Sequence, residues 1–222
     1  MGALRSHVAL LGDSIFDNRA YVGRGPDVIA QLRGLLPRGW IATLCAVDGA
    51  VTSGLAAQLH RVPAEATHLV VSIGGNDALQ NSDLLAAPAA SSAEVLRVIA
   101  DRVGAFERAY RAAIEAALHL GRDTTVCTVY NGALEPERAA IARIALALFN
   151  DAILRTALDL RLTAIDLRSV CDEPADYANA IEPSSRGGAK IAAAIACSLG
   201  AVAGCPAPAS VWGSVRERSA RG

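Results

Sequence analysis

The stretch His7-Val8-Ala9-Leu10-Leu11-Gly12-Asp13-Ser14 determines how this chain folds. Its first part, from His7 to Leu11, is an almost entirely apolar run, which predicts a strand buried on both faces. Gly12 and Asp13 then end the strand in a turn, and Ser14 follows with its hydroxyl group. Because ligands of open α/β sheets bind at the carboxyl ends of the strands, Ser14 is expected where a reactive group can be reached.

The same alternation of apolar runs and helical patterns continues along the chain. Further strands are predicted over Trp40–Val47, His68–Ile73, Thr124–Val129 and Thr163–Asp166. Helices are predicted over Asp27–Leu36, Thr52–Leu59, Ser92–Leu120, Glu137–Leu160 and Gly187–Leu199. With right-handed crossovers this pattern predicts an α/β fold, a three-layer αβα sandwich. Its doubly wound, five-stranded parallel sheet should have the flavodoxin-like strand order 2-1-3-4-5.

The length of 222 residues is that of one α/β domain of ordinary size. We expect this domain to span residues 1–200. The remaining residues, 201–222, are rich in Pro, Ser, Gly and Arg. This composition predicts a loosely attached or disordered C-terminal tail.

Composition and charge argue against several classes of function. The formal net charge is −1 and the charges are scattered, so neither nucleic acid nor a membrane surface is an expected partner. No leader-like segment and no apolar stretch of the ~18–20 residues needed to span a membrane occurs, so we expect a cytoplasmic protein. The five cysteines form no CxxC pair, which favours reduced, buried thiols. The glycine-rich nucleotide-binding patterns are also missing, and we expect no cofactor and no metal.

Polar groups follow the first three predicted strands. Ser14 follows the first, Asp48-Gly49-Ala50 the second, and Gly74-Gly75-Asn76-Asp77 the third. A hydroxyl, a glycine backbone N–H and an amide side chain at one edge of a sheet are the parts of a serine esterase that stabilises an oxyanion.

The ordered blocks Gly12-Asp13-Ser14, Gly49 and Gly74-Gly75-Asn76-Asp77 resemble the SGNH (GDSL) hydrolase superfamily of esterases, lipases and acylhydrolases. The resemblance spans most of the domain, from about Val8 to Leu199. It implies that Ser14 is the nucleophile, and that the oxyanion hole consists of the Ser14 N–H, the Gly49 N–H and the Asn76 side chain. It also implies hydrolysis of a small-molecule carboxylic ester through an acyl-enzyme.

The chain departs from that superfamily in the last motif block. The family's Asp-x-x-His is followed by Pro, a polar residue and a Gly, and here the equivalent stretch is Asn179-Ala180-Ile181-Glu182-Pro183. Glu182 therefore stands in the place of the histidine and Asn179 in that of the aspartate. The four histidines present (His7, His60, His68 and His119) lie at strand starts or helix ends, where a structural role is expected.

Three hypotheses follow for the missing base. In the first, Glu182 accepts the proton of Ser14. An uncharged Asn179 can then replace the family's aspartate, because no imidazolium forms that would need a negative charge to stabilise it. In the second, the base is another carboxylate, from the loop residues Asp172, Glu173 and Asp176 or from Asp13 and Asp77 in the motifs. In the third, the protein is catalytically impaired and binds an acyl or sugar-ester ligand or a protein partner.

Each candidate residue also has a purely structural interpretation. Ser14 suits a turn and Asn76 a helix cap, whereas Asn179 and Asp13 would brace their loops. Asp77 would pair with backbone N–H groups at the head of the next segment. Glu182 would cap the last helix or pair with Arg186 four residues later. We also expect the loops Asn81–Ser91 and Val170–Ala180 to shape any pocket.

Overall fold

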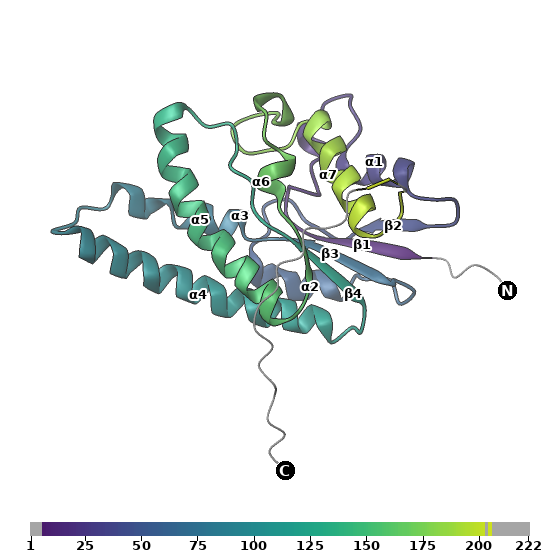
Figure 1. The fold of residues 1–222 in the computed structure, drawn as a ribbon, viewed down its shortest axis with the longest axis horizontal. Coiled ribbons are helices and arrows are strands. Elements are labelled where there is room, and N and C mark those ends of the chain that lie inside the picture. Colours follow the sequence, from purple (N-terminus) through teal and green to yellow (C-terminus); the bar gives the residue numbers. More distant parts are fainter. Residues whose placement is uncertain (1–5, 203, 206–222) are drawn as a thin grey trace, which may run out of the picture.

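The computed structural model describes residues 6–202 and 204–205, which form a sheet covered by helices on both faces (Figure 1). Its strands are β1 (His7–Gly12), β2 (Ile41–Leu44), β3 (His68–Ser72), β4 (Asp123–Cys127) and β5 (Thr163–Ile165). All neighbouring strands are parallel and the order is β2-β1-β3-β4-β5. The predicted fold class and strand order are confirmed.

Successive residues of β1 point to opposite faces of the sheet and enter two separate cores. Val8 and Leu10 pack with α1 (Val28–Leu35), α6 (Leu167–Val170) and α7 (Ser185–Ser198). Ala9 and Leu11 pack with α2 (Leu55–Leu59), α4 (Ser92–Leu118) and α5 (Pro136–Asp159). Because helices cover both faces of the sheet and strands flank β1 on both sides, all six of its residues are buried.

The five predicted helices are present, with ends that differ by at most three residues from the predicted ones. One exception is the segment predicted over Thr52–Leu59, which begins as a 3₁₀ helix, η2 (Thr52–Gly54), before α2. The sequence analysis missed α3 (Gly75–Gln80), which contains Asn76. Short 3₁₀ helices complete the described chain: η1 (Arg19–Tyr21), η3 (Ser82–Ala86) and η4 (Pro174–Asp176).

Two expectations about the sheet and the cysteines need correction. Thr163 and Ala164 of β5 are exposed, because β5 is an edge strand, whereas burial on both faces was expected. Cys45, Cys127 and Cys171 are free and buried, as expected, but Cys197 of α7 forms a disulfide with Cys205. The expectation of reduced thiols is therefore wrong for this pair, whose second member lies beyond the helix.

The predicted tail, residues 201–222, lies mostly outside the described residues, which end at Cys205 and omit position 203. Among the helices of the described part, none combines the length and apolar character that crossing a membrane requires.

Candidate active site

Ser14 lies directly beyond β1 in a tight turn that is built around Gly12. The Gln58 side chain accepts a hydrogen bond from the Gly12 N–H (2.8 Å) and donates one to the Gly12 carbonyl (2.7 Å). Gly12 has a φ of +136°, and a Cβ atom at this position would lie 1.7 Å from the Ser72 carbonyl oxygen. Only glycine fits there, and the turn that it allows presents Ser14 at the carboxyl edge of the sheet.

The Ser14 hydroxyl donates a hydrogen bond to Glu182 Oε1 over 3.1 Å. The two residues are 168 positions apart in sequence and both are nearly buried, with 8% and 7% of their surface exposed. The structure therefore joins the first and last candidate residues in one contact. A carboxylate that accepts a serine hydroxyl has the geometry of a base next to a nucleophile.

Burial raises the pKa of the Glu182 carboxyl above its ordinary value, because the charged form loses hydration. The Ser14 hydroxyl opposes this rise by donating a hydrogen bond to the carboxylate, and the negative charge of Asp48 adds to it. The second oxygen, Oε2, is buried without a hydrogen-bond partner among the described residues. A carboxylate with a raised pKa binds a proton more readily than a solvated glutamate does.

Asn179 shapes the backbone that carries Glu182. Its Oδ1 accepts hydrogen bonds from the N–H groups of Ile181 and Glu182, both over 2.9 Å. The Glu182 carbonyl in turn accepts from the Ala178 N–H over 2.8 Å. Asn179 therefore holds the turn from which the Glu182 side chain projects. Within the described residues it forms no hydrogen bond with Ser14.

Asn76 lines the same cavity as Ser14, and Gly49 follows β2 at the same carboxyl edge of the sheet. Asn76, in the first turn of α3, donates from Nδ2 to the Ala50 carbonyl over 2.9 Å, which leaves the second N–H of that amide free. This bond ties Asn76 to the turn that contains Gly49, whose φ is +77°. Within the described chain, neither the Ser14 N–H nor the Gly49 N–H donates a hydrogen bond.

Asp13 and Asp77 brace the site. Asp13 Oδ1 accepts from the Ile15 N–H over 3.1 Å, whereas its Oδ2 is buried without a described partner. Burial raises the pKa of Asp13 to about 7, and the nearby charges of Glu182 and Asp77 add to the rise. Asp77 Oδ2 accepts from the N–H and the hydroxyl of Thr52, at 2.9 and 3.0 Å. Asp77 therefore joins α3 to the head of η2. It accepts from a backbone N–H, as expected, but this N–H belongs to an earlier segment of the chain and not to the following one.

The other loop carboxylates are engaged with cations. Lys190 Nζ donates to Asp172 and to the fully buried Asp176, over 2.9 and 2.8 Å. Glu173 pairs with Arg186. Arg186 is thus paired away from Glu182, and α7 is capped by Ser184, whose Oγ accepts from the Gly187 N–H. The alternative roles of Glu182, as a cap or as the partner of Arg186, are wrong.

The four histidines lie away from Ser14 in structural positions. His7 and His68 begin β1 and β3, at the amino edge of the sheet, and contact Thr43 and Thr67. His60 follows the last residue of α2, and His119 follows the last residue of α4. The expected structural role of these residues is confirmed.

Three side chains that position the site could not be identified from the sequence. They are Gln58, described above, Asn18 and Tyr130. Asn18 is fully buried, and its Nδ2 donates to the Pro183 carbonyl over 3.2 Å while its Oδ1 accepts from the Val28 N–H. The Tyr130 hydroxyl donates to the Ile181 carbonyl over 2.7 Å. No local pattern marks these residues, because their partners lie between 10 and 165 positions away.

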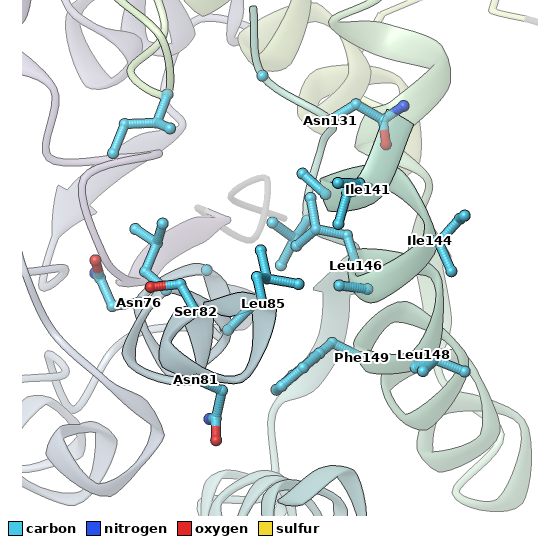
Figure 2. Close-up of a pocket in the computed structure, with 18 of the residues that line it drawn as sticks. Asn76, Asn81, Ser82, Leu85, Asn131, Ile141, Ile144, Leu146, Leu148 and Phe149 are labelled. Carbon is cyan, nitrogen blue, oxygen red and sulfur yellow. The ribbon is translucent and has the colours of Figure 1, made fainter. Parts of the chain in front are cut away.

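A cavity of about 490 Å³ opens onto Ser14, Asn76 and Glu182 and continues toward η3, α4 and α5 (Figure 2). The loop Asn81–Ser91 contributes several lining residues, as expected. The loop Val170–Ala180 contributes none, so that prediction is wrong. The ion pairs of Asp172, Glu173 and Asp176 hold that loop against α7 instead. Among the residues described, no group of three His, Cys, Asp or Glu side chains is arranged to hold a metal ion.

Comparison with known proteins gives one family and several structural neighbours. The family model described as the GDSL-like lipase/acylhydrolase family matches residues 10–189. No curated protein matches the chain.

Several solved structures share the fold. An extracellular lipase from Streptomyces rimosus has a TM-score of 0.65 at 16% identity, with 89% of this chain and 100% of that chain covered. The acetylxylan esterase Axe2 from Geobacillus stearothermophilus has a TM-score of 0.65 at 18% identity, with coverages of 89% and 96%. LAE5, an α/β hydrolase from the metagenome of Lake Arreo, has a TM-score of 0.66 at 20% identity, with coverages of 88% and 95%.

Proposed function

The chain belongs to the GDSL-like lipase/acylhydrolase family, a family of ester-acting hydrolases, and we propose that it is a serine esterase whose general base is Glu182. The observation that carries this proposal is the 3.1 Å hydrogen bond from Ser14 Oγ to Glu182 Oε1 at the mouth of a cavity. The substrate is a small-molecule carboxylic ester.

In this mechanism Ser14 Oγ attacks the ester carbonyl carbon and its proton passes to Glu182. The carbonyl oxygen becomes an oxyanion that the Ser14 N–H, the Gly49 N–H and Asn76 Nδ2 stabilise; each such donor contributes on the order of 3–4 kcal/mol. The C–O bond to the alcohol then breaks, and Glu182 returns the proton to the departing alcohol. Water, deprotonated by Glu182, hydrolyses the acyl-enzyme and releases the acid, and Ser14 recovers its proton.

Glu182 takes the position of the family's histidine, and Asn179 that of its aspartate. A carboxylate base becomes neutral when it accepts the proton, so it needs no anion behind it, whereas an imidazolium does. Asn179 serves instead as the acceptor that orients the Glu182 backbone. The raised pKa of Glu182 favours proton transfer, because a base is most effective when its pKa is close to the working pH.

The test is hydrolysis of para-nitrophenyl acetate and longer esters by the wild type, Ser14→Ala and Glu182→Gln, over a pH series. We expect Ser14→Ala to abolish turnover and Glu182→Gln to lower kcat by about 10²–10⁴-fold. In the wild type, kcat should rise with pH through a pKa above the ordinary glutamate value, because only the carboxylate form is a base. The folded state of each variant is checked by circular dichroism.

Glu173→Gln is the matched control, since it removes a carboxylate of the neighbouring loop that pairs with Arg186. It should retain wild-type kcat. If Glu182→Gln retains full activity while Ser14→Ala does not, another group is the base. If none of the proteins hydrolyses any ester, the proposal fails in favour of a ligand-binding protein.

A further inference from the structure

The cavity at Ser14 extends well beyond the candidate catalytic groups into an open apolar cleft. Besides Ser14, Asn76 and Glu182, its walls come from α3, η3, the first half of α4, the segment 129–134 and the part of α5 up to Phe149. Figure 2 shows Leu85 of η3 on the side of Asn76, with Ile141, Leu146 and Phe149 of α5 opposite. Leu85 and Ile141 remain 55% and 52% exposed, so the cleft presents large aliphatic side chains to solvent, as ligand-binding grooves do.

The cleft exists because two helices are longer than the sheet that they cover. The 27 residues of α4 span about 40 Å, whereas a five-residue strand spans only about 17 Å. The buried residues of α4 begin at Phe106 and those of α5 at Phe149. The preceding halves of both helices diverge from each other beyond the sheet (Figure 1). Several of their apolar side chains, such as Val95, Ile99 and Ile144, therefore line the cleft, and none of these three is among the buried residues of its helix.

The chemistry of the walls favours a hydrocarbon ligand. The aliphatic residues of the lining include Leu84, Val95, Ile99, Val103, Ile144 and Leu148. Arg102 also lines the cleft, but its guanidinium donates to Asn81 Oδ1 and lies 3.5 Å from Asp83 Oδ2. Few hydrogen-bonding groups remain for a sugar, whereas each methylene group buried in such a cleft can raise affinity by up to about fourfold.

We propose that the cleft between η3, α4 and α5 binds the acyl chain of the substrate, so that the protein prefers esters of medium-chain fatty acids to acetyl esters. The inference rests on the proposed esterase function, since the ester carbonyl must lie at Ser14 with the chain directed into the cleft. The continuity of the cavity from Ser14 to Ile141 supports this orientation. The volume of about 490 Å³ is typical of a small-molecule site.

Ala145→Trp tests the inference, with Ala147→Trp as its matched control on the same helix. Ala145 lines the cleft, whereas Ala147 is exposed and lies outside the lining. In the wild type, kcat/KM for para-nitrophenyl octanoate should exceed that for the acetate by at least about tenfold. Ala145→Trp should lower this ratio at least about tenfold by filling the cleft, and Ala147→Trp should leave it unchanged. Equal kcat/KM values for acetate and octanoate in the wild type would overturn the inference and leave the esterase function intact.

A binding measurement separates this inference from catalysis. Decanoate should bind to the Ser14→Ala protein in isothermal titration calorimetry, and the added Ala145→Trp change should weaken it at least about tenfold. If the wild type hydrolyses no ester but decanoate binds in this way, the proposed function fails and the acyl site stands. If Ala145→Trp alters the oligomeric state without changing decanoate binding, the cleft is a contact between two copies of the chain, and the acyl site is wrong.

Discussion

At Asn179, one oxygen atom organises the backbone of the residue proposed as the base. Asn179→Ala removes the acceptor of the Ile181 and Glu182 N–H groups. Each such bond is worth about 1 kcal/mol, so we expect kcat to fall by about tenfold while KM changes little. Asn179→Asp keeps an acceptor but adds a negative charge near Glu182, which should raise the pKa of Glu182 and move the kcat profile to higher pH. Steady-state kinetics over a pH series checks both variants, and a wild-type kcat for Asn179→Ala would contradict the positioning role.

The raised pKa of Asp13 predicts that the stability of the protein depends on pH. Its pKa is raised to about 7 in the folded state, so the folded protein binds more protons than the unfolded chain between the ordinary aspartate value and about pH 7. The free energy of unfolding therefore falls as pH rises through this window. An asparagine amide oxygen would still accept from the Ile15 N–H, so Asp13→Asn should raise the unfolding free energy by on the order of 2 kcal/mol at about pH 8 and change it little at about pH 4. Urea denaturation at both pH values measures this, and the same difference at both would exclude the titration of Asp13 as the cause.

At the level of elements, the turn after β1 depends on one glycine. Gly12→Ala would place a Cβ atom against the Ser72 carbonyl at a positive φ, so it should destabilise the fold by more than about 3 kcal/mol. Gly34 of α1 has no atom within 4 Å of its hypothetical Cβ. Gly34→Ala should therefore stabilise the protein by about 0.5–1 kcal/mol. Thermal unfolding of the two variants compares them directly, and a mild effect of Gly12→Ala would show that β1 and β3 can separate at this end.

The strands and long helices were predictable because their signal is local. The apolar run of β1 and the periodicity of α4 are properties of neighbouring residues. By contrast, α3 begins with Gly75-Asn76-Asp77, a composition that indicates a turn, and it is only six residues long. It is held by contacts with other elements, such as the hydrogen bond that Thr52 donates to Asp77 and the one that Asn76 donates to the Ala50 carbonyl. Such contacts have no local pattern.

At the level of the whole molecule, the Cys197–Cys205 disulfide ties the end of α7 to the last described residue. Closing a chain segment of this length, with a sequence separation of 8, contributes about 2 kcal/mol. Cys205→Ser should therefore lower Tm by about 4–8 °C. The rate of ester hydrolysis should be unchanged, because the 14 residues of α7 put the disulfide about 20 Å from Ser184. A reducing agent should lower the Tm of the wild type and not that of Cys205→Ser. An equal loss of Tm in both proteins would contradict the Cys197–Cys205 disulfide.

The fold class, the strand order and the identity of Ser14, Asn76 and Glu182 as candidates followed from the order of amino acids alone. Hydrophobic periodicity and motif order are written in consecutive residues and need no long-range information. The folded molecule was needed to establish that Glu182 contacts Ser14, that Asp172, Glu173 and Asp176 pair with cations, and that α4 and α5 leave an apolar cleft. These outcomes depend on which distant side chains the packed sheet and helices bring within hydrogen-bonding distance, and burial then sets the pKa of each carboxyl.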